Sequence, residues 1–291
     1  MRRLRYAPIV AGVALAAVPA AWFVRLIVAT PPLIVLGAAA PAVCWVGLIL
    51  LLDRREREPL RALLTMFLWG AVIAAFLSSF ANDQLLAWVG GITGEEWGRL
   101  LISTVAGPVV EETAKAAALV GLLVVWRAEF GGILDGIVYG ALVGMGFAMT
   151  ENITYFTLAT LQSGRPGLVR AIYLRALLGG VNHAAFTATF GASLGWSREH
   201  GWRAWRFVPS VGFLGVVLQH LAWNAVASDR ITQILCNPET VGGVCRDAPD
   251  RVDLLVTVPL LVALCLGPGV VALAVLVTLA RRAPRRSPVG G

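Results

Sequence analysis

Two adjacent glutamates and a lysine lie in the middle of a long apolar stretch. Glu111, Glu112 and Lys115 fall within the run from about Leu100 to Trp126, which is long enough to cross a membrane. A charged residue at the centre of a bilayer costs about 2.5–3.5 kcal/mol on insertion scales, so such residues usually face the interior of a helix bundle. Lys115 follows Glu111 by four residues and Glu112 by three, so on a helix it can reach either carboxylate. The cluster predicts a buried polar site within a membrane-spanning bundle.

Pro108 precedes these acids in the same stretch. A proline removes one backbone donor and pushes against the carbonyl four residues earlier, here at Thr104. The helix is therefore predicted to bend just before the glutamates. The alternative is a purely structural ion pair that fixes the helix register, but two acids with one base exceed what that role needs.

The composition indicates a membrane protein built from helices. The chain has 291 residues, of which 58% are hydrophobic and 14% charged. Several apolar runs reach the roughly 20 residues that cross a bilayer. We predict an all-α fold, a polytopic transmembrane helical bundle with spans near residues 7–29, 31–52, 62–81, 100–126, 132–158, 169–196, 207–228 and 253–280. The first run begins like a signal peptide, but its apolar sequence continues to Val28, which favours an uncleaved anchor.

The arginines predict the orientation of these spans. If both termini are cytoplasmic, the inner segments hold 15 arginines and the outer segments 6, in agreement with the positive-inside rule. The net charge of +7 therefore does not indicate a nucleic-acid partner. We predict a multi-pass protein of the cell membrane with loops 82–99 and 229–252 outside. Cys236 and Cys245 share the second loop and are predicted to form a disulfide there.

The same spans divide the chain into four parts. Residues 1–99 would form three N-terminal spans, and residues 100–228 a catalytic core of four spans. Residues 229–252 would form the extracytoplasmic loop, and residues 253–291 the last span with a basic cytoplasmic tail.

Two consecutive spans carry matching stripes at a spacing of four residues. The fifth span has Gly136, Gly140, Gly144 and Ala148. The sixth has Gly179, His183, Thr187, Gly191 and Gly195. Small residues in such a stripe let a neighbouring helix approach closely. Phe147 and Glu151 continue the stripe of the fifth span, so Glu151 is predicted to point into the bundle.

Two of the chain's three histidines lie deep in apolar spans. His183 is in the sixth span, and His220 is in the seventh with Asn224 one turn later. Counted along their helices, both histidines, Glu111 and Glu151 lie between the middle of the membrane and its outer surface. We predict that these side chains line one polar cavity in the outer half of the membrane.

These residue types suit hydrolysis. Glu111 or Glu112 can take a proton from water as a general base, with Lys115 beside the pair. His220 and Asn224 can donate hydrogen bonds to the developing oxyanion. The sequence has no Gly-x-Ser-x-Gly and no His-Glu-x-x-His motif, and no serine or cysteine is adjacent to either histidine. A mechanism with a nucleophilic side chain is therefore not favoured.

A metal-dependent version of the same site is equally compatible with the sequence. Glu111, Glu151, His183 and His220 offer the nitrogen and oxygen ligands that zinc prefers. Water activated by a glutamate and water activated by zinc both remain open at this stage. Arg175 also interrupts an apolar span. Its side chain can reach the membrane surface or bind a substrate carboxylate, and we expect the first.

Three motifs follow one another along consecutive spans: Glu111-Glu112-x-x-Lys115, Phe147-x-x-x-Glu151 and His220-x-x-x-Asn224. This order resembles the PrsW-type intramembrane proteases, which belong to a superfamily with the CAAX prenyl proteases. The resemblance implies cleavage of membrane-tethered proteins, in the best-known case an anti-sigma factor. It covers roughly residues 100–228, and Asn224 stands where the family often has aspartate.

A different class of function uses the same kind of cluster. Buried glutamate, lysine and histidine side chains also form proton relays, so a proton-coupled transporter or a non-catalytic membrane scaffold is the alternative. The motif-bearing spans show no inverted repeat, which counts against a transporter.

Overall fold

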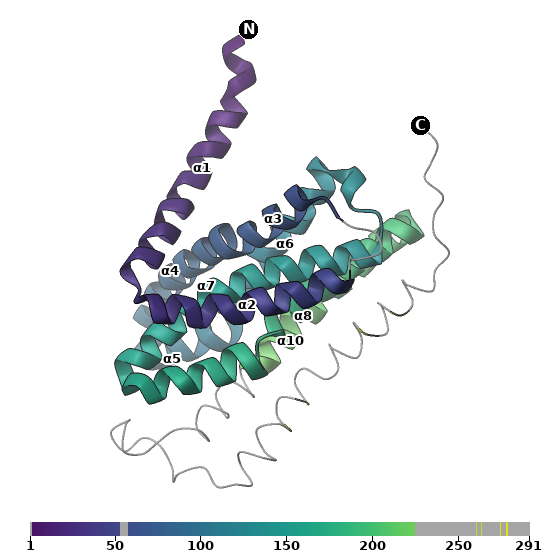
Figure 1. Cartoon of the computed structure of the whole chain (residues 1–291). Coiled ribbons are helices and arrows are strands. Elements are labelled where there is room, and N and C mark those ends of the chain that lie inside the picture. Colours follow the sequence, from purple (N-terminus) through teal and green to yellow (C-terminus); the bar gives the residue numbers. More distant parts are fainter. Residues whose placement is uncertain are drawn as a thin grey trace.

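The structure is a computed structural model, and Figure 1 shows its arrangement of helices. Residues 2–52 and 58–224 are described, with single positions between 260 and 278. These residues form helices and no strand, so the predicted all-α fold is confirmed for the described part of the chain. The loop 229–252 with Cys236 and Cys245, the end of the seventh predicted span, and nearly all of 253–291 lie outside the described residues.

The N-terminal helices form three segments. Helix α1 spans Arg2–Ala29 and α2 spans Pro32–Leu52. The third segment joins α3 (Leu60–Leu68), a π-helical turn η1 (Trp69–Ala74) and α4 (Ala75–Thr93) without a break. This segment is longer than the predicted span 62–81.

A tight turn follows α4, where an open loop was expected. Gly94 has a φ of 88°, which favours glycine, and α5 (Glu95–Leu101) begins directly after it. The prediction of a loop over 82–99 is wrong, because α4 continues to Thr93 and α5 begins at Glu95. Helix α5 runs through the π-helical turn η2 (Ile102–Ala106) into α6 (Gly107–Val125), so the helix over the fourth predicted span begins before residue 100.

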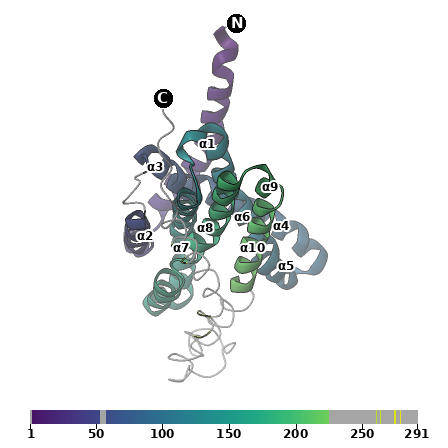
Figure 2. The same cartoon turned by 90° about the vertical axis from the view of Figure 1, so that its right-hand side faces the viewer.

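Helix α7 (Ile133–Ala171) forms the centre of the bundle and follows the short turn η3 (Arg127–Glu129). Nearly every side chain between residues 136 and 148 is buried. Figure 2 shows α8 (Asn182–His200) beside α7, with α10 (Val208–Ala222) on the other side of α8. The short helix α9 (Trp202–Trp205) connects α8 to α10.

The sixth predicted span is not one continuous helix. Helix α7 kinks at Ser163 and Gly164 and continues to Ala171, where the π-helical segment η4 (Ile172–Leu178) begins. The chain then leaves helical geometry over residues 179–181 before α8 starts. The prediction of one span over 169–196 is wrong here, since a glycine pair at 179–180 interrupts the apolar sequence.

The matching stripes of the fifth and sixth spans do pack against each other. A Cβ atom added to Gly144 on α7 would lie 2.0 Å from the carbonyl oxygen of His183 on α8. A Cβ atom added to Gly191 on α8 would lie 1.8 Å from the carbonyl oxygen of Gly136. The two backbones therefore touch, as predicted from the spacing of small residues. This contact fixes the position of His183 against the central helix.

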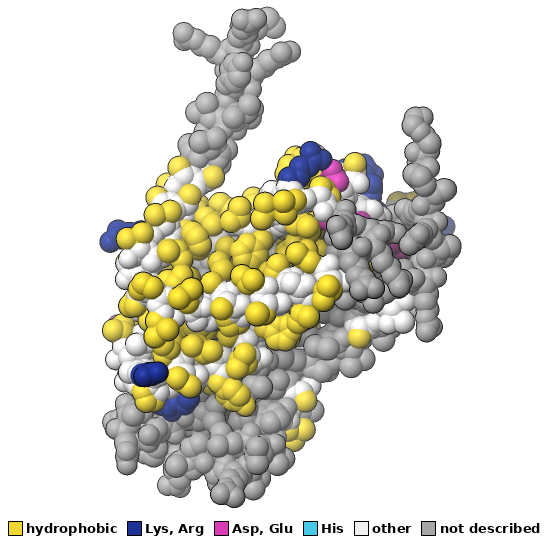
Figure 3. Space-filling view, viewed as in Figure 1, with side chains coloured by type: hydrophobic (Ala, Val, Ile, Leu, Met, Phe, Trp, Pro, Cys, Tyr) yellow, Lys and Arg dark blue, Asp and Glu magenta, His cyan; other side chains and the backbone are white. Residues whose placement is uncertain are grey.

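The outer surface suits a lipid environment. Three helical stretches of the described chain are long and apolar enough to cross a membrane, namely Pro32–Leu51, Leu60–Thr93 and Ile133–His200. Figure 3 shows one face of the molecule covered mainly by hydrophobic side chains, with charged side chains gathered at its edges. Helix α6 is not among the three stretches, because it carries the charged cluster.

Candidate active site

Helix α6 turns its charged residues inward. Glu111, Glu112 and Lys115 are buried, whereas Val109 and Val120 on other faces are exposed. The charges thus follow the helical spacing of a core face, although the residues are polar. The π-helical turn η2 directly precedes this face, so the helix departs from regular α-helical geometry just before the acids. The bend predicted from Pro108 stays a prediction.

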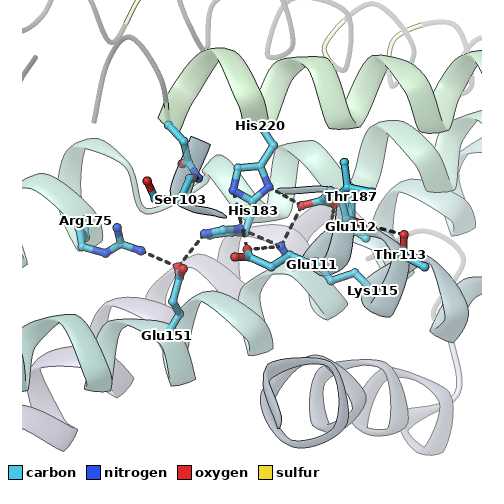
Figure 4. A network of polar contacts seen from close by, with 12 residues as sticks. Ser103, Glu111, Glu112, Thr113, Lys115, Glu151, Arg175, His183, Thr187 and His220 are labelled. Carbon is cyan, nitrogen blue, oxygen red and sulfur yellow. Dashed lines mark hydrogen bonds and ion pairs between the residues drawn. The ribbon is translucent and has the colours of Figure 1, made fainter. Parts of the chain in front are cut away.

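Lys115 lies at the centre of the network drawn in Figure 4. Its Nζ atom donates to Glu112 Oε1 at 2.8 Å and to His183 Nδ1 at 2.9 Å. The same Nζ lies 3.7 Å from Glu111 Oε2 and 3.7 Å from the centroid of the Phe147 ring. The side chain is fully buried. Lys115 therefore joins the residues of the first two motifs and His183 into one cluster.

The contacts of Lys115 assign the tautomer of His183. An ammonium group has only donors, so His183 Nδ1 must accept and its proton must be on Nε2. His183 Nε2 lies 2.9 Å from Glu151 Oε2 and donates to it. Glu151 thus reaches the network through His183, in agreement with the prediction that it points into the bundle.

Arg175 turns into the bundle and pairs with Glu151 there. Its guanidinium group donates to Glu151 Oε2 at 2.5 Å and to Asn152 Oδ1 at 3.0 Å, and it lies 3.8 Å from the centroid of the Tyr155 ring. The expected snorkelling of Arg175 is wrong, because three groups on α7 satisfy it. In the sequence, the indication that Arg175 belongs to this network is its position in an apolar segment, eight residues before His183.

The two adjacent glutamates have different surroundings. Glu112 accepts from Lys115, from His220 Nδ1 at 2.9 Å and from Thr187 Oγ1 at 3.4 Å. Glu111 Oε2 is buried and has no hydrogen-bond partner among the described residues. It lies 3.8 Å from His220 Nε2. Buried carboxylate oxygens rarely lack partners, so this atom is placed for a ligand or a reaction.

Comparisons with known proteins agree with the motifs. The model of the family described as "PrsW family intramembrane metalloprotease" matches residues 58–264. The chain belongs to this family. "Protease PrsW" of Geobacillus kaustophilus is 35% identical over 159 residues, 55% of this chain and 64% of that protein. "Protease PrsW" of Bacillus subtilis is 30% identical over 165 residues, 57% of this chain and 69% of that protein.

A third relative also carries the family name. "Protease PrsW" of Clostridioides difficile is 31% identical over 140 residues, 48% of this chain and 55% of that protein. The chain therefore spans somewhat more than half to about two thirds of the length of these PrsW relatives. No solved structure matches the chain. The predicted family is confirmed, and the protein is a membrane protein.

The family name implies a metal, and the residues present fit one. Glu111, His183 and His220 each offer a ligand atom within 4.8 Å of those of the other two, and all three are buried. Two histidines and one carboxylate are a common ligand set of catalytic zinc. Glu111 Oε2 accepts no hydrogen bond from the described residues, which supports this fit. Glu112 accepts from Nδ1 of His220, so the lone pair on Nε2 of His220 is available for a metal.

Glu151 is the exception in the predicted set of metal ligands. It contacts the outer nitrogen of His183, where it orients the ring, and it is not part of the group of three. Carboxylates that accept from the second nitrogen of a ligating histidine are a usual feature of such sites. The PrsW motif Phe147-x-x-x-Glu151 therefore supplies a residue that supports the histidine.

Asn224 lies at the edge of the network in this PrsW protein. It follows α10 one turn after His220, and its amide nitrogen donates to the carbonyl oxygen of Ser103 at 2.9 Å. In the described part of the chain, it has no hydrogen bond to the glutamates or histidines. Its predicted catalytic role stays a prediction.

Proposed function

We propose that this protein is an intramembrane peptidase that hydrolyses a peptide bond of a membrane-tethered protein. The observation that carries this proposal is the meeting of unpartnered Glu111 Oε2 with His183 and His220 inside the bundle. Three separate helices supply these groups, and the protein belongs to the PrsW family. An anti-sigma factor is the substrate class that the family resemblance implies.

Each side chain of the network has a defined task in this proposal. Glu111 Oε2 accepts the proton of the attacking water, because it alone of the two glutamates has an unused acceptor. Glu112 holds the proton of His220 on Nδ1 and thereby turns the Nε2 lone pair toward Glu111. This geometry favours a ligand or base role for His220 over the predicted role of oxyanion donor. Asn224 retains one free N–H bond for the oxyanion.

A metal ion fits the same proposal. Glu111, His183 and His220 would hold it, and it would supply Lewis-acid catalysis at the scissile carbonyl. His183 would bind through Nδ1, which accepts from Lys115 in this structure, so the metal would take the place of the Lys115 ammonium there. Glu151 would then orient His183 from Nε2, while Glu112 orients His220. Treatment of the purified protein with a chelator distinguishes the two versions. Loss of cleavage that zinc restores favours the metal, and unchanged cleavage favours glutamate alone.

The test of the function compares membrane-protein fragments in cells that carry the intact protein or the Glu111→Gln variant. Fragments of a cleaved substrate should be present with the intact protein and absent with the variant. Glu95→Gln, a substitution of the same kind at an exposed turn, is the control and should leave the fragments unchanged. Identical fragment sets in all three strains would contradict peptidase activity. A transporter or scaffold would give this result, and the family membership does not favour either.

We also propose the orientation with both termini in the cytoplasm and more than one pass through the membrane. The distribution of arginines supports it. A reporter enzyme that works only outside the cytoplasm should be active when it is fused after Ala248. Activity of a cytoplasm-specific reporter at the same position would overturn this orientation.

Arg175 is expected to act through Glu151 and His183 and to have no contact with substrate. Its replacement by glutamine removes the ion pair with Glu151 and loosens the support of His183. Changes to such supporting residues typically cost about 10–100-fold in activity or metal affinity. We expect Arg175→Gln to lower kcat by this factor with little change in KM. Arg175→Lys should recover part of the lost kcat. Arg165→Gln, at the exposed kink of α7, is the control. A loss confined to KM would contradict the positioning role.

A further inference from the structure

The connection between α8 and α10 carries exposed aromatic and basic residues in alternation. From Trp202 to Phe207 the sequence reads Trp-Arg-Ala-Trp-Arg-Phe. The exposed fractions of Trp202 and Phe207 are both 65%, and that of Trp205 is 39%. Tryptophan and arginine side chains of this kind gather where a membrane meets water. Figure 2 shows α9 at one end of the bundle, between α8 and α10.

Arg203 and Arg206 in this connection differ from Arg61 and Arg198 at the same end. Arg61 pairs with Glu129, and Arg198 donates to the carbonyl oxygen of Phe130. Arg203 and Arg206 are exposed and have no ion pair among the described residues. Their guanidinium groups instead lie 6.0 and 5.5 Å from the Trp202 ring. Both positive charges therefore lie next to one aromatic ring, which an anion can approach together with them.

An apolar cavity begins beside these arginines. Its volume is about 320 Å³, and it lies between α8 and α10. The residues that line it are Thr189, Ala192, Ser193, Trp196, Phe207, Val208, Val211 and Gly212. The two hydroxyl groups in this lining are already used, since Ser193 donates to the Phe190 carbonyl and Thr189 to the Ala185 carbonyl. The cavity therefore presents hydrocarbon surface to its occupant.

Phe207 connects the two features. It lines the cavity, and its ring lies 5.5 Å from the guanidinium group of Arg206. A molecule bound in the cavity would therefore have one end next to Arg203 and Arg206. A molecule that fits both features has a flexible hydrocarbon chain and an anionic head. A cavity of this size is in the range that binds small molecules.

We propose that this surface binds one anionic phospholipid, with an acyl chain between α8 and α10 and the phosphate at Arg203 and Arg206. The charge of the two arginines favours an anionic lipid over a zwitterionic one. With the proposed orientation, the site faces the cytoplasmic leaflet, in which anionic lipids attract basic residues. The site is separate from the cluster around Lys115, so its occupancy can be tested without any substrate.

The test uses the full chain purified in a neutral detergent and native mass spectrometry of its lipid adducts. The probes are a phosphatidylglycerol and a phosphatidylcholine with the same acyl chains. We expect at least tenfold tighter binding of phosphatidylglycerol and loss of this preference in the Arg203→Gln, Arg206→Gln variant, since each basic residue near an anionic surface contributes roughly a fivefold effect. Arg165 lies near the C-terminal end of α7, at the opposite end from the proposed site. The Arg165→Gln variant should therefore retain the preference for phosphatidylglycerol.

A second variant tests the cavity itself. Val211 lines the cavity and is exposed, so Val211→Trp should fill it without disturbing the core. We expect weaker binding of both lipids in this variant and normal binding in Leu218→Trp, two turns further along the exposed face of α10. Glycerol phosphate, which has the head but no chain, should not compete with the lipid. Equal binding of the two lipids to the intact protein, or competition by glycerol phosphate alone, would overturn the proposal.

Discussion

Replacing Glu111 with glutamine is expected to lower the rate of peptide cleavage by about 10²–10⁴-fold, the usual contribution of a positioned general base. Glutamine keeps the shape of the side chain but removes its negative charge and its basicity. Glu111 Oε2 accepts no hydrogen bond from the described residues, so the substitution changes the glutamate that has an acceptor available for a water molecule. The measurement is the cleavage rate of a fragment-yielding substrate by protein reconstituted in lipid.

The matched change at Glu112 separates catalysis from support. Glu112 accepts from Lys115, His220 and Thr187, so Glu112→Gln should release His220 from its orientation and leave Lys115 without its nearest acceptor. We expect a loss of activity in this variant together with a lower thermal stability, whereas Glu111→Gln should keep the stability of the intact protein. Glu95→Gln removes a carboxylate from an exposed pair and should change neither quantity. Full cleavage by Glu111→Gln would refute the proposed base.

The features that the sequence predicted well are those that depend on spacing along one helix. Lys115 was expected to reach the glutamates because they are three and four residues away, and it does. The glycine stripes were expected to bring two helices together, and the carbonyl of His183 does touch Gly144. Each of these depends on helix geometry alone, which does not require knowledge of the fold.

The features that were missed depend on how separate helices meet. Arg175 lies in a π-helical segment before a break, so counting along a regular helix did not place it beside Glu151. The difference between Glu111 and Glu112 depends on His220 and Thr187, which lie on two other helices. The proton on His220 is then set by Glu112. A single sequence gives no measure of these distances, so the ligand set was predicted with Glu151 included.

Adding one methyl group at Gly144 is expected to be among the most damaging small changes in this protein. A Cβ atom there would lie 2.0 Å from the carbonyl oxygen of His183 and 2.4 Å from its carbonyl carbon. Both atoms are backbone, so neither can turn away, and α7 and α8 must move apart. Overpacking of a well-packed core typically costs about 1–3 kcal/mol, and occasionally more. The same movement would shift His183 away from Lys115 and Glu151.

Gly144→Ala should therefore lower thermal stability and cleavage together, while Gly121→Ala provides the matched control. Gly121 lies in α6, and no atom lies within 4 Å of a Cβ atom placed there. Replacing a mid-helix glycine with alanine at an open position stabilises a helix by roughly 0.5–1 kcal/mol, so this control should be neutral or slightly more stable. The same methyl group thus has opposite expected effects at two positions. Unfolding curves and cleavage rates of both variants measure them. If Gly144→Ala matched Gly121→Ala in both, the close contact of α7 with α8 would not be what holds His183 in the site.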